Sequence, residues 1–124
     1  MKRKIAVVED NPDNRLLVQA LLEEWYEITE YETGVEAVEG LPQEPPDLIL
    51  LDISLPEMDG TEVLEKIREV EALKDVPVVA LTAHAMAGDR EKYLNHGFND
   101  YLAKPIVDDS LLLDTIARWL NQTE

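Results

Sequence analysis

The chain has 124 residues, of which 45% are hydrophobic and 31% are charged, and these values describe one globular domain. It has no cysteine and no apolar N-terminal segment of signal-peptide type, which excludes a disulfide framework and a thiolate metal site and favours the cytoplasm. A formal net charge of −16 repels phosphate backbones and anionic lipids, so we expect no direct contact with nucleic acid or membranes.

The first half of the chain alternates short apolar runs with helical patterns. Residues 5–8 are apolar and predict a strand. Asn11 followed by Pro12 predicts the start of a helix, because asparagine caps helices and proline suits their first position. Residues 26–31 alternate as a short strand, and residues 34–40 predict a short helix that ends in glycine.

The second half continues this alternation. Residues 48–51 and 78–81 are apolar runs of strand length, and residues 63–67 between them have helical spacing. Residues 88–96 predict a helix that ends at a glycine, and residues 101–103 predict the fifth strand. The last helix has an apolar side made of Leu112, Leu113, Ile116 and Leu120. Five strands alternating with five helices predict an α/β fold, an open parallel sheet covered on both faces.

Polar side chains stand where four of the predicted strands end. Glu9 and Asp10 follow the first strand, and Asp52 directly follows residues 48–51. Thr82 ends the next run, and Lys104 follows the last. The carboxyl ends of parallel strands share one edge, where open α/β sheets bind their ligands. This convergence predicts a site that holds a divalent cation and receives a phosphoryl group.

These segments resemble the receiver domain of response regulators in two-component signalling, a CheY-like family with stand-alone and hybrid-kinase members. The matching segments are residues 8–11, 51–60, 82–83 and 101–105. The resemblance covers the whole chain and implies one receiver domain over residues 1–124 with no output domain. It also implies a flavodoxin-like, doubly wound sheet of five parallel strands in the order 2-1-3-4-5. Glu9 and Asp10 would then lie beside Asp52.

The resemblance assigns the acids to metal binding and phosphorylation. It implies that Asp52 accepts the phosphoryl group and that Asp10, Asp52 and the backbone carbonyl of Ser54 ligate Mg²⁺. Glu9 would act on the metal through water. Mg²⁺ prefers oxygen ligands and keeps several waters, so a few carboxylates suffice. Without a cation the clustered acids repel one another, and we therefore expect phosphorylation to require Mg²⁺.

The resemblance assigns the remaining polar residues to a switch. Lys104 would offset the phosphoryl charge, and Thr82, with Ala83 as its small neighbour, would bond a phosphoryl oxygen. Tyr101 would rotate into the space that Thr82 vacates, so that the surface of the fourth helix, fifth strand and fifth helix changes. Such a protein is a phosphoacceptor that assists only its own phosphorylation and dephosphorylation, and is not an enzyme in the ordinary sense.

The implied partners are a histidine kinase or a histidine-phosphotransfer protein and a downstream protein effector. On the first helix we expect one arc to face the core, made of Leu16, Leu17, Ala20 and Leu21. Val18 and Leu22 lie outside that arc, beside Arg15. Helix-in-groove docking uses such apolar stripes. We therefore predict that Arg15, Val18 and Leu22 dock a helical bundle that carries a phosphohistidine.

Two other functions are compatible with parts of the pattern. A haloacid-dehalogenase-like phosphatase also uses an aspartate at a strand end, but its motif is Asp-x-Asp. In this chain Ser54 stands where the second aspartate of that motif would be. A passive interaction module with the same fold needs no phosphorylation, but it should have lost an acid, the threonine or the lysine, and none is missing. Both alternatives are less consistent with the sequence than a phosphorylation switch.

Overall fold

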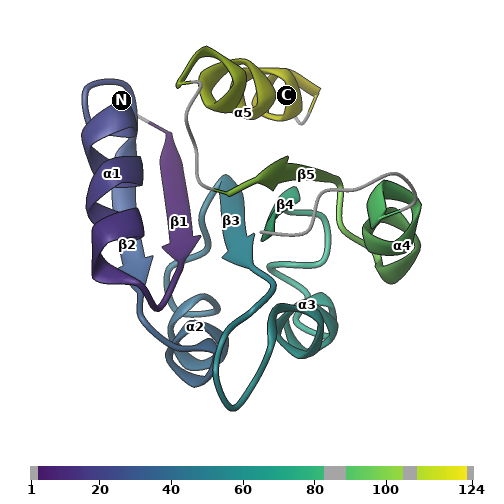
Figure 1. Ribbon diagram of the computed structural model, residues 1–124. Helices are drawn as coiled ribbons and strands as arrows, with labels where there is room; N and C mark the ends of the chain where they lie inside the picture. Colours follow the sequence, from purple (N-terminus) through teal and green to yellow (C-terminus); the bar gives the residue numbers. More distant parts are fainter. Residues whose placement is uncertain (1–2, 83–88, 105–108, 123–124) are drawn as a thin grey trace.

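The computed structural model describes residues 3–82, 89–104 and 109–122 (Figure 1). The strands are β1 Lys4–Val8, β2 Glu27–Tyr31, β3 Leu48–Asp52, β4 Val78–Thr82 and β5 Asp100–Ala103. The helices are α1 Pro12–Leu22, α2 Gly34–Gly40, α3 Gly60–Arg68, α4 Asp89–His96 and α5 Asp109–Gln122. Within the described segments, no helix combines the length and the apolar character needed to cross a membrane.

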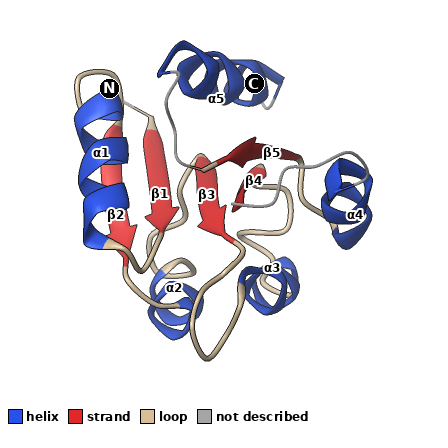
Figure 2. Cartoon of the chain, in the orientation of Figure 1, coloured by secondary structure: helices blue, strands red, loops and turns tan. Residues whose placement is uncertain are grey.

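The five strands form one sheet in the order β2-β1-β3-β4-β5, and every neighbouring pair is parallel. This order confirms the predicted doubly wound, flavodoxin-like arrangement. Figure 2 shows the strands between helices, with α2 and α3 below the sheet and α5 above it. We call the side covered by α1 and α5 the α1–α5 face, and the side covered by α2 and α3, with α4 beside β5, the α2–α3 face.

Alternating side chains give each face its own core. Ile5 and Val7 of β1 pack with α1 and α5, whereas Ala6 and Val8 pack on the α2–α3 face. The central strands β3 and β4 are buried at every position, because helices cover both of their faces. This is why the sequence shows them as continuous apolar runs and not as an alternation.

Side chains at the N-termini fix where three helices begin. Asn11 caps α1 by accepting hydrogen bonds from the backbone N–H groups of Asp13 and Asn14, as the sequence predicted. Thr33 caps α2 and Asp59 caps α3 in the same way. Hydrogen bonds from Thr61 and from the first turn of α3 lower the pKa of the Asp59 carboxyl. Each helix therefore starts at a defined point after its strand.

The prediction for the faces of α1 is wrong. The structure buries Val18, which is 1% exposed, and Leu22, which is 0% exposed, in the core of the α1–α5 face. Leu16 is instead 66% exposed and Leu17 is 38% exposed. Apolar residues cover an arc of this helix wider than one buried face, so spacing alone did not determine which side faces the sheet. Val18 and Leu22 are inside the protein and cannot dock a partner.

Candidate functional site

The strand register brings the predicted acids to the same level of the sheet. Val8 of β1 pairs with Leu51 of β3, so the residues that follow them, Glu9 and Asp52, are neighbours. Asp10 follows Glu9 in the turn before α1. The order of strands, with β1 beside β3, therefore places all three acids at one point of the carboxyl edge, as expected.

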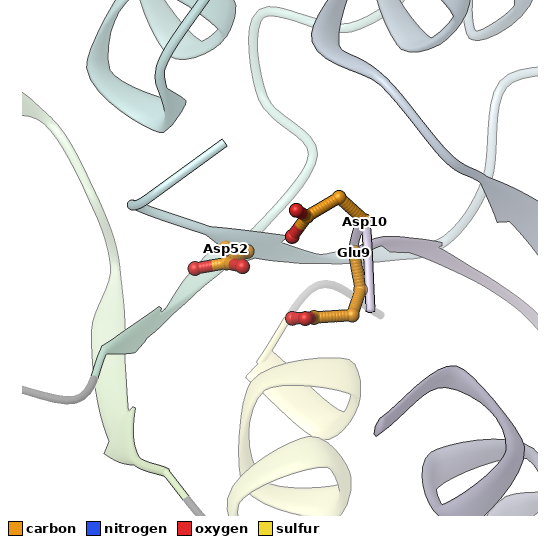
Figure 3. A group of neighbouring side chains, drawn as sticks. All are labelled: Glu9, Asp10 and Asp52. Atoms are coloured by element: carbon orange, nitrogen blue, oxygen red, sulfur yellow. The ribbon is translucent and has the colours of Figure 1, made fainter. Parts of the chain in front are cut away.

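Glu9, Asp10 and Asp52 point toward one another in a tight cluster (Figure 3). One carboxylate oxygen from each residue lies within 4.8 Å of the other two. Glu9 and Asp52 are each only 1% exposed. Burial raises the pKa of the Glu9 carboxyl, and the nearby charge of Asp52 raises it further. Three converging carboxylates are a suitable donor set for a hard divalent cation.

Lys104 supplies a positive charge to this cluster. Its Nζ lies 2.9 Å from Asp52 Oδ2 and 3.2 Å from Glu9 Oε2. The backbone N–H of Lys104 donates to the carbonyl of Thr82 at 2.8 Å, which extends the β4–β5 pairing to the site. Burial acts to lower the pKa of the Lys104 ammonium, but the hydrogen bonds and ion pairs with Asp52 and Glu9 together outweigh burial and leave the pKa raised. Lys104 is therefore a firmly charged ammonium group facing acids.

Arg15 holds the acidic turn from the start of α1. Its guanidinium donates to the carbonyl oxygens of Glu9 at 2.8 Å and Asp10 at 3.3 Å. The same group forms an ion pair with Glu30 of β2, with Nε 3.3 Å from the carboxylate. The Nδ2 group of Asn14 donates to Glu9 Oε1 at 3.3 Å. Arg15 thus contacts the backbone of the acidic turn, a positioning role that sequence reasoning missed in favour of docking.

The loop after β3 folds back onto the end of that strand. The backbone N–H of Ser54 donates to Asp52 Oδ1 at 2.9 Å, which orients the carboxylate. The backbone N–H of Gly60 donates to the carbonyl of Ile53 at 3.0 Å and closes the loop. Glu57 has a φ of 65°, a left-handed conformation uncommon for residues other than glycine. The contact of Ser54 with Asp52 is through its N–H, and its carbonyl as a metal ligand is still a prediction.

Thr82 and Tyr101, the predicted switch residues, meet a residue that the sequence did not single out. Thr82 is 1% exposed, and its Oγ1 lies 2.9 Å from the hydroxyl of Tyr93 in α4. The ring centroid of Tyr93 lies 6.3 Å from that of the half-buried Tyr101. Ala83, predicted as the small neighbour of Thr82, lies outside the described residues. The structure thus gathers the acids and Lys104 in one group, and Thr82, Tyr93 and Tyr101 in another.

Comparison with known proteins finds relatives over most of the chain. The family model described as response regulator receiver domain matches residues 5–117. The signal transduction histidine-protein kinase BarA of Escherichia coli (strain K12) is 47% identical over 108 residues, which are 86% of this chain and 12% of that kinase. The polar-differentiation response regulator DivK of Brucella ovis is 41% identical over 107 residues, which are 86% of this chain and 87% of DivK. The chain therefore spans a small part of the kinase and most of DivK.

Solved structures with the same fold include one with a bound metal. The receiver domain of the sensor histidine kinase PA1611 from Pseudomonas aeruginosa PAO1 matches with a TM-score of 0.89 and 39% identity, covering 98% of this chain and 99% of that one. That structure has a magnesium ion coordinated in its active site cleft. The chemotaxis protein CheY4 of Vibrio cholerae matches with a TM-score of 0.88 and 26% identity, covering 95% of this chain and 98% of that one. These matches confirm the resemblance to receiver domains inferred from the sequence.

Proposed function

The chain belongs to the response regulator receiver domain family, and on that premise we propose that it is a phosphorylation-dependent switch with Asp52 as phosphoacceptor. The observation that carries the proposal is the placement of Asp52. Its carboxylate ends a buried strand, contacts the Lys104 ammonium at 2.9 Å and lies in the acid cluster with Glu9 and Asp10. Asp52 also accepts a hydrogen bond from Ser54, so its orientation is set before any donor arrives.

The proposed reaction is an in-line displacement at phosphorus. An oxygen of Asp52 forms a bond to the phosphorus atom, and the bond between phosphorus and the donor breaks, with the electron pair leaving on the donor. The protein then contributes mainly position and charge neutralisation. Lys104 is placed to donate to a phosphoryl oxygen next to Asp52. Ser54 supplies no second carboxyl after Asp52, which argues against the phosphatase alternative.

The acid cluster fits a magnesium ion. Its donors are all oxygens, and two of its three members, Glu9 and Asp52, are buried close to each other. Burial and this proximity raise the pKa of the Glu9 carboxyl, and a bound cation would lower that pKa again. We assign Asp10, Asp52 and the Ser54 carbonyl as ligands, with Glu9 acting through water. When bound, Mg²⁺ neutralises the acids and the phosphoryl oxygens. The magnesium in the active site cleft of the PA1611 receiver domain supports the choice of magnesium as the cation.

Phosphorylation of Asp52 would then act on a second group of residues. We propose that Thr82 bonds a phosphoryl oxygen, that Ala83 leaves room for this movement, and that Tyr101 follows. The surface of α4, β5 and α5 would change as a result, and a downstream protein effector would recognise it. Because Tyr101 lies in β5 and contacts the ring of Tyr93 in α4, a shift of Thr82 has a short path to that surface.

Intact mass spectrometry tests the function and the metal site together. Incubated with phosphoramidate and Mg²⁺, the protein should gain one phosphoryl group, and excess chelator should prevent the gain. Asp10→Asn should raise the Mg²⁺ concentration needed for half-maximal rate by at least about tenfold, because a carboxylate near a cation is worth more than about 1 kcal/mol. Asp13→Asn, the same change on an exposed acid of α1 outside the cluster, is the control and should behave like the wild type. Equal rates with magnesium and with chelator would contradict the metal assignment.

The phosphodonor is proposed to be a histidine kinase or a histidine-phosphotransfer protein, since several relatives are histidine kinases. Leu16 and Leu17 are exposed leucines of α1, the helix that directly follows the acidic turn. Leu17 also lines a small cavity together with Glu9 and Lys104. We therefore propose Leu16 and Leu17, in place of Val18 and Leu22, as the residues of α1 that contact the phosphodonor.

The donor for this test is a phosphorylated histidine-phosphotransfer domain that transfers its phosphoryl group to the wild-type protein. Leu16→Asp should slow this transfer by about tenfold or more, as expected for a central contact residue. Phosphorylation by phosphoramidate should be unchanged, because Leu16 is 66% exposed and is not a member of the acid cluster. Val35→Asp is the matched control, since Val35 is an exposed aliphatic residue of α2 on the opposite face. Equal loss with both donors would indicate misfolding, and loss in Val35→Asp alone would place the contact elsewhere.

A further inference from the structure

Tyr93 of α4 makes a buried hydrogen bond with the hydroxyl of Thr82. The two oxygens are 2.9 Å apart, and the residues are 4% and 1% exposed. Water does not compete freely for such a pair, so the bond stabilises whichever arrangement of β4 and α4 contains it. The residue that ends β4 at the functional edge is thereby tied directly to a helix of the expected output surface.

The ring of Tyr93 extends this contact to two other residues. Its centroid lies 6.3 Å from that of Tyr101, with the rings tilted by 42°, and 6.3 Å from that of Phe98, with the rings perpendicular. Both distances are within the range of favourable aromatic contacts. A movement of Tyr93 would therefore disturb Tyr101 in β5 and the segment that connects α4 to β5.

The Thr82–Tyr93 hydrogen bond lies on the other side of the sheet from the acid cluster. Thr82 is two residues after Ala80, which packs with Tyr93 in the core of the α2–α3 face. Asp52 is two residues after Leu50, which packs in the core of the α1–α5 face. Side chains two apart in a strand share a face. Thr82 thus belongs with Tyr93, and its side chain is turned away from the side to which Asp52 belongs.

The orientation of the Thr82 side chain makes the two arrangements compete. A hydroxyl has one proton to donate, and phosphoryl oxygens only accept, so Thr82 must donate its proton to bond a phosphoryl group on Asp52. Reaching that group also requires Thr82 to turn away from the α2–α3 face. The contact with Tyr93 opposes that rotation, whichever of the two hydroxyls is the donor.

We propose that Tyr93 is a positioning residue of the switch, whose hydroxyl holds Thr82 on the α2–α3 face until a phosphoryl group on Asp52 draws Thr82 away. The inference rests on the proposed phosphorylation of Asp52 and adds to it the element that biases the unphosphorylated state. Loss of the bond frees the Tyr93 ring to move against Tyr101. We call the conformation with the changed α4, β5 and α5 surface the output arrangement, and the conformation with the Thr82–Tyr93 hydrogen bond the resting arrangement. This hydrogen bond then sets how often the unphosphorylated protein adopts the output arrangement.

Tyr93→Phe tests this, because it removes the hydroxyl and keeps the ring that packs on Tyr101 and Phe98. The ratio of output to resting arrangement should rise roughly three- to tenfold, the worth of one net hydrogen bond. In unphosphorylated Tyr93→Phe, the amide resonance of Tyr101 should move along the line that joins its unphosphorylated and phosphorylated wild-type positions. The rate of phosphorylation by phosphoramidate should rise by the same factor, as long as the output arrangement is the reactive one and a minor state. Tyr26→Phe, the same substitution at a half-buried tyrosine just before β2, is the control and should change neither measurement.

Thr82→Ala provides a second test that does not depend on the stability of Tyr93→Phe. It breaks the same hydrogen bond from the other side, so the Tyr101 amide of the unphosphorylated protein should move in the same direction. In the double variant the two shifts should not add, because one bond is lost in all three proteins. An unmoved Tyr101 amide in both single variants, or slower phosphorylation of Tyr93→Phe, would overturn the proposal. If wild-type protein gained no phosphoryl group, the proposed function would fail first, whereas normal phosphorylation with an unmoved amide would refute Tyr93 alone.

Discussion

Asp52→Asn should abolish the phosphoryl mass gain completely. An amide has no nucleophilic oxygen of comparable strength, and no other acid of the described residues combines full burial with contacts to Lys104 and Ser54. Intact mass spectrometry after incubation with phosphoramidate and Mg²⁺ measures the result. Asp59→Asn is the matched control, because asparagine still caps α3 and Asp59 lies outside the cluster. A phosphoryl gain in Asp52→Asn would show that another residue is the acceptor.

The same substitution should stabilise the metal-free protein. The cluster carries three acids against the single charge of Lys104, and the charge of Asp52 helps to raise the pKa of Glu9. An acid whose pKa is raised by folding destabilises the folded state at pH values above its unfolded pKa, so at neutral pH Glu9 opposes folding. Removing the charge of Asp52 relieves part of the electrostatic repulsion on the Glu9 carboxylate. We therefore expect the free energy of unfolding in chelator to rise by about 1 kcal/mol. Urea denaturation at neutral pH measures the change, and a clear decrease would contradict the electrostatic account.

The acid site could be predicted from the sequence because it depends on strand ends. The runs that precede Glu9, Asp52 and Lys104 are short, apolar and bounded, so their carboxyl ends were visible as abrupt changes from apolar to charged residues. Parallel strands bring such ends to one edge whatever the details of packing. The order of the strands was not contained in this pattern and came from the family resemblance.

The orientation of α1 and the contact of Tyr93 could not be predicted in this way. Apolar residues cover an arc of α1 wider than one buried face, so the helical period alone does not choose between Leu17 and Val18 for the core. The hydrogen bonds of Arg15 to the acidic turn help to fix the rotation, and they involve backbone carbonyls that no sequence pattern marks. Tyr93 stands in a mostly polar helix, and its partner Thr82 belongs to a different element, β4. Both features depend on tertiary packing.

Gly60 provides the second large effect, because the backbone of Asp52 leaves no room for a side chain there. A Cβ atom on Gly60 would lie 2.5 Å from the carbonyl oxygen of Asp52 and 2.8 Å from the Cα of Ile53. Both atoms belong to the backbone, so no rotation of a side chain relieves the overlap. The start of α3 and the end of β3 must therefore separate in Gly60→Ala, and the phosphoacceptor moves with its strand.

Gly60→Ala should lower the free energy of unfolding by about 2–3 kcal/mol, the cost of inserting a methyl group where nothing can yield. Phosphorylation by phosphoramidate should slow roughly 100-fold, since a displacement of about 1 Å at a reacting group has effects of that size. Gly40→Ala is the matched control, because the atoms nearest to its Cβ belong to the side chain of Tyr31, which can shift, and not to the backbone of Asp52. Urea denaturation measures the loss of stability in both variants, and the phosphorylation rate measures the displacement of Asp52. A Gly60→Ala protein that is phosphorylated at the wild-type rate would show that the carboxylate of Asp52 does not depend on the close packing of α3 against β3.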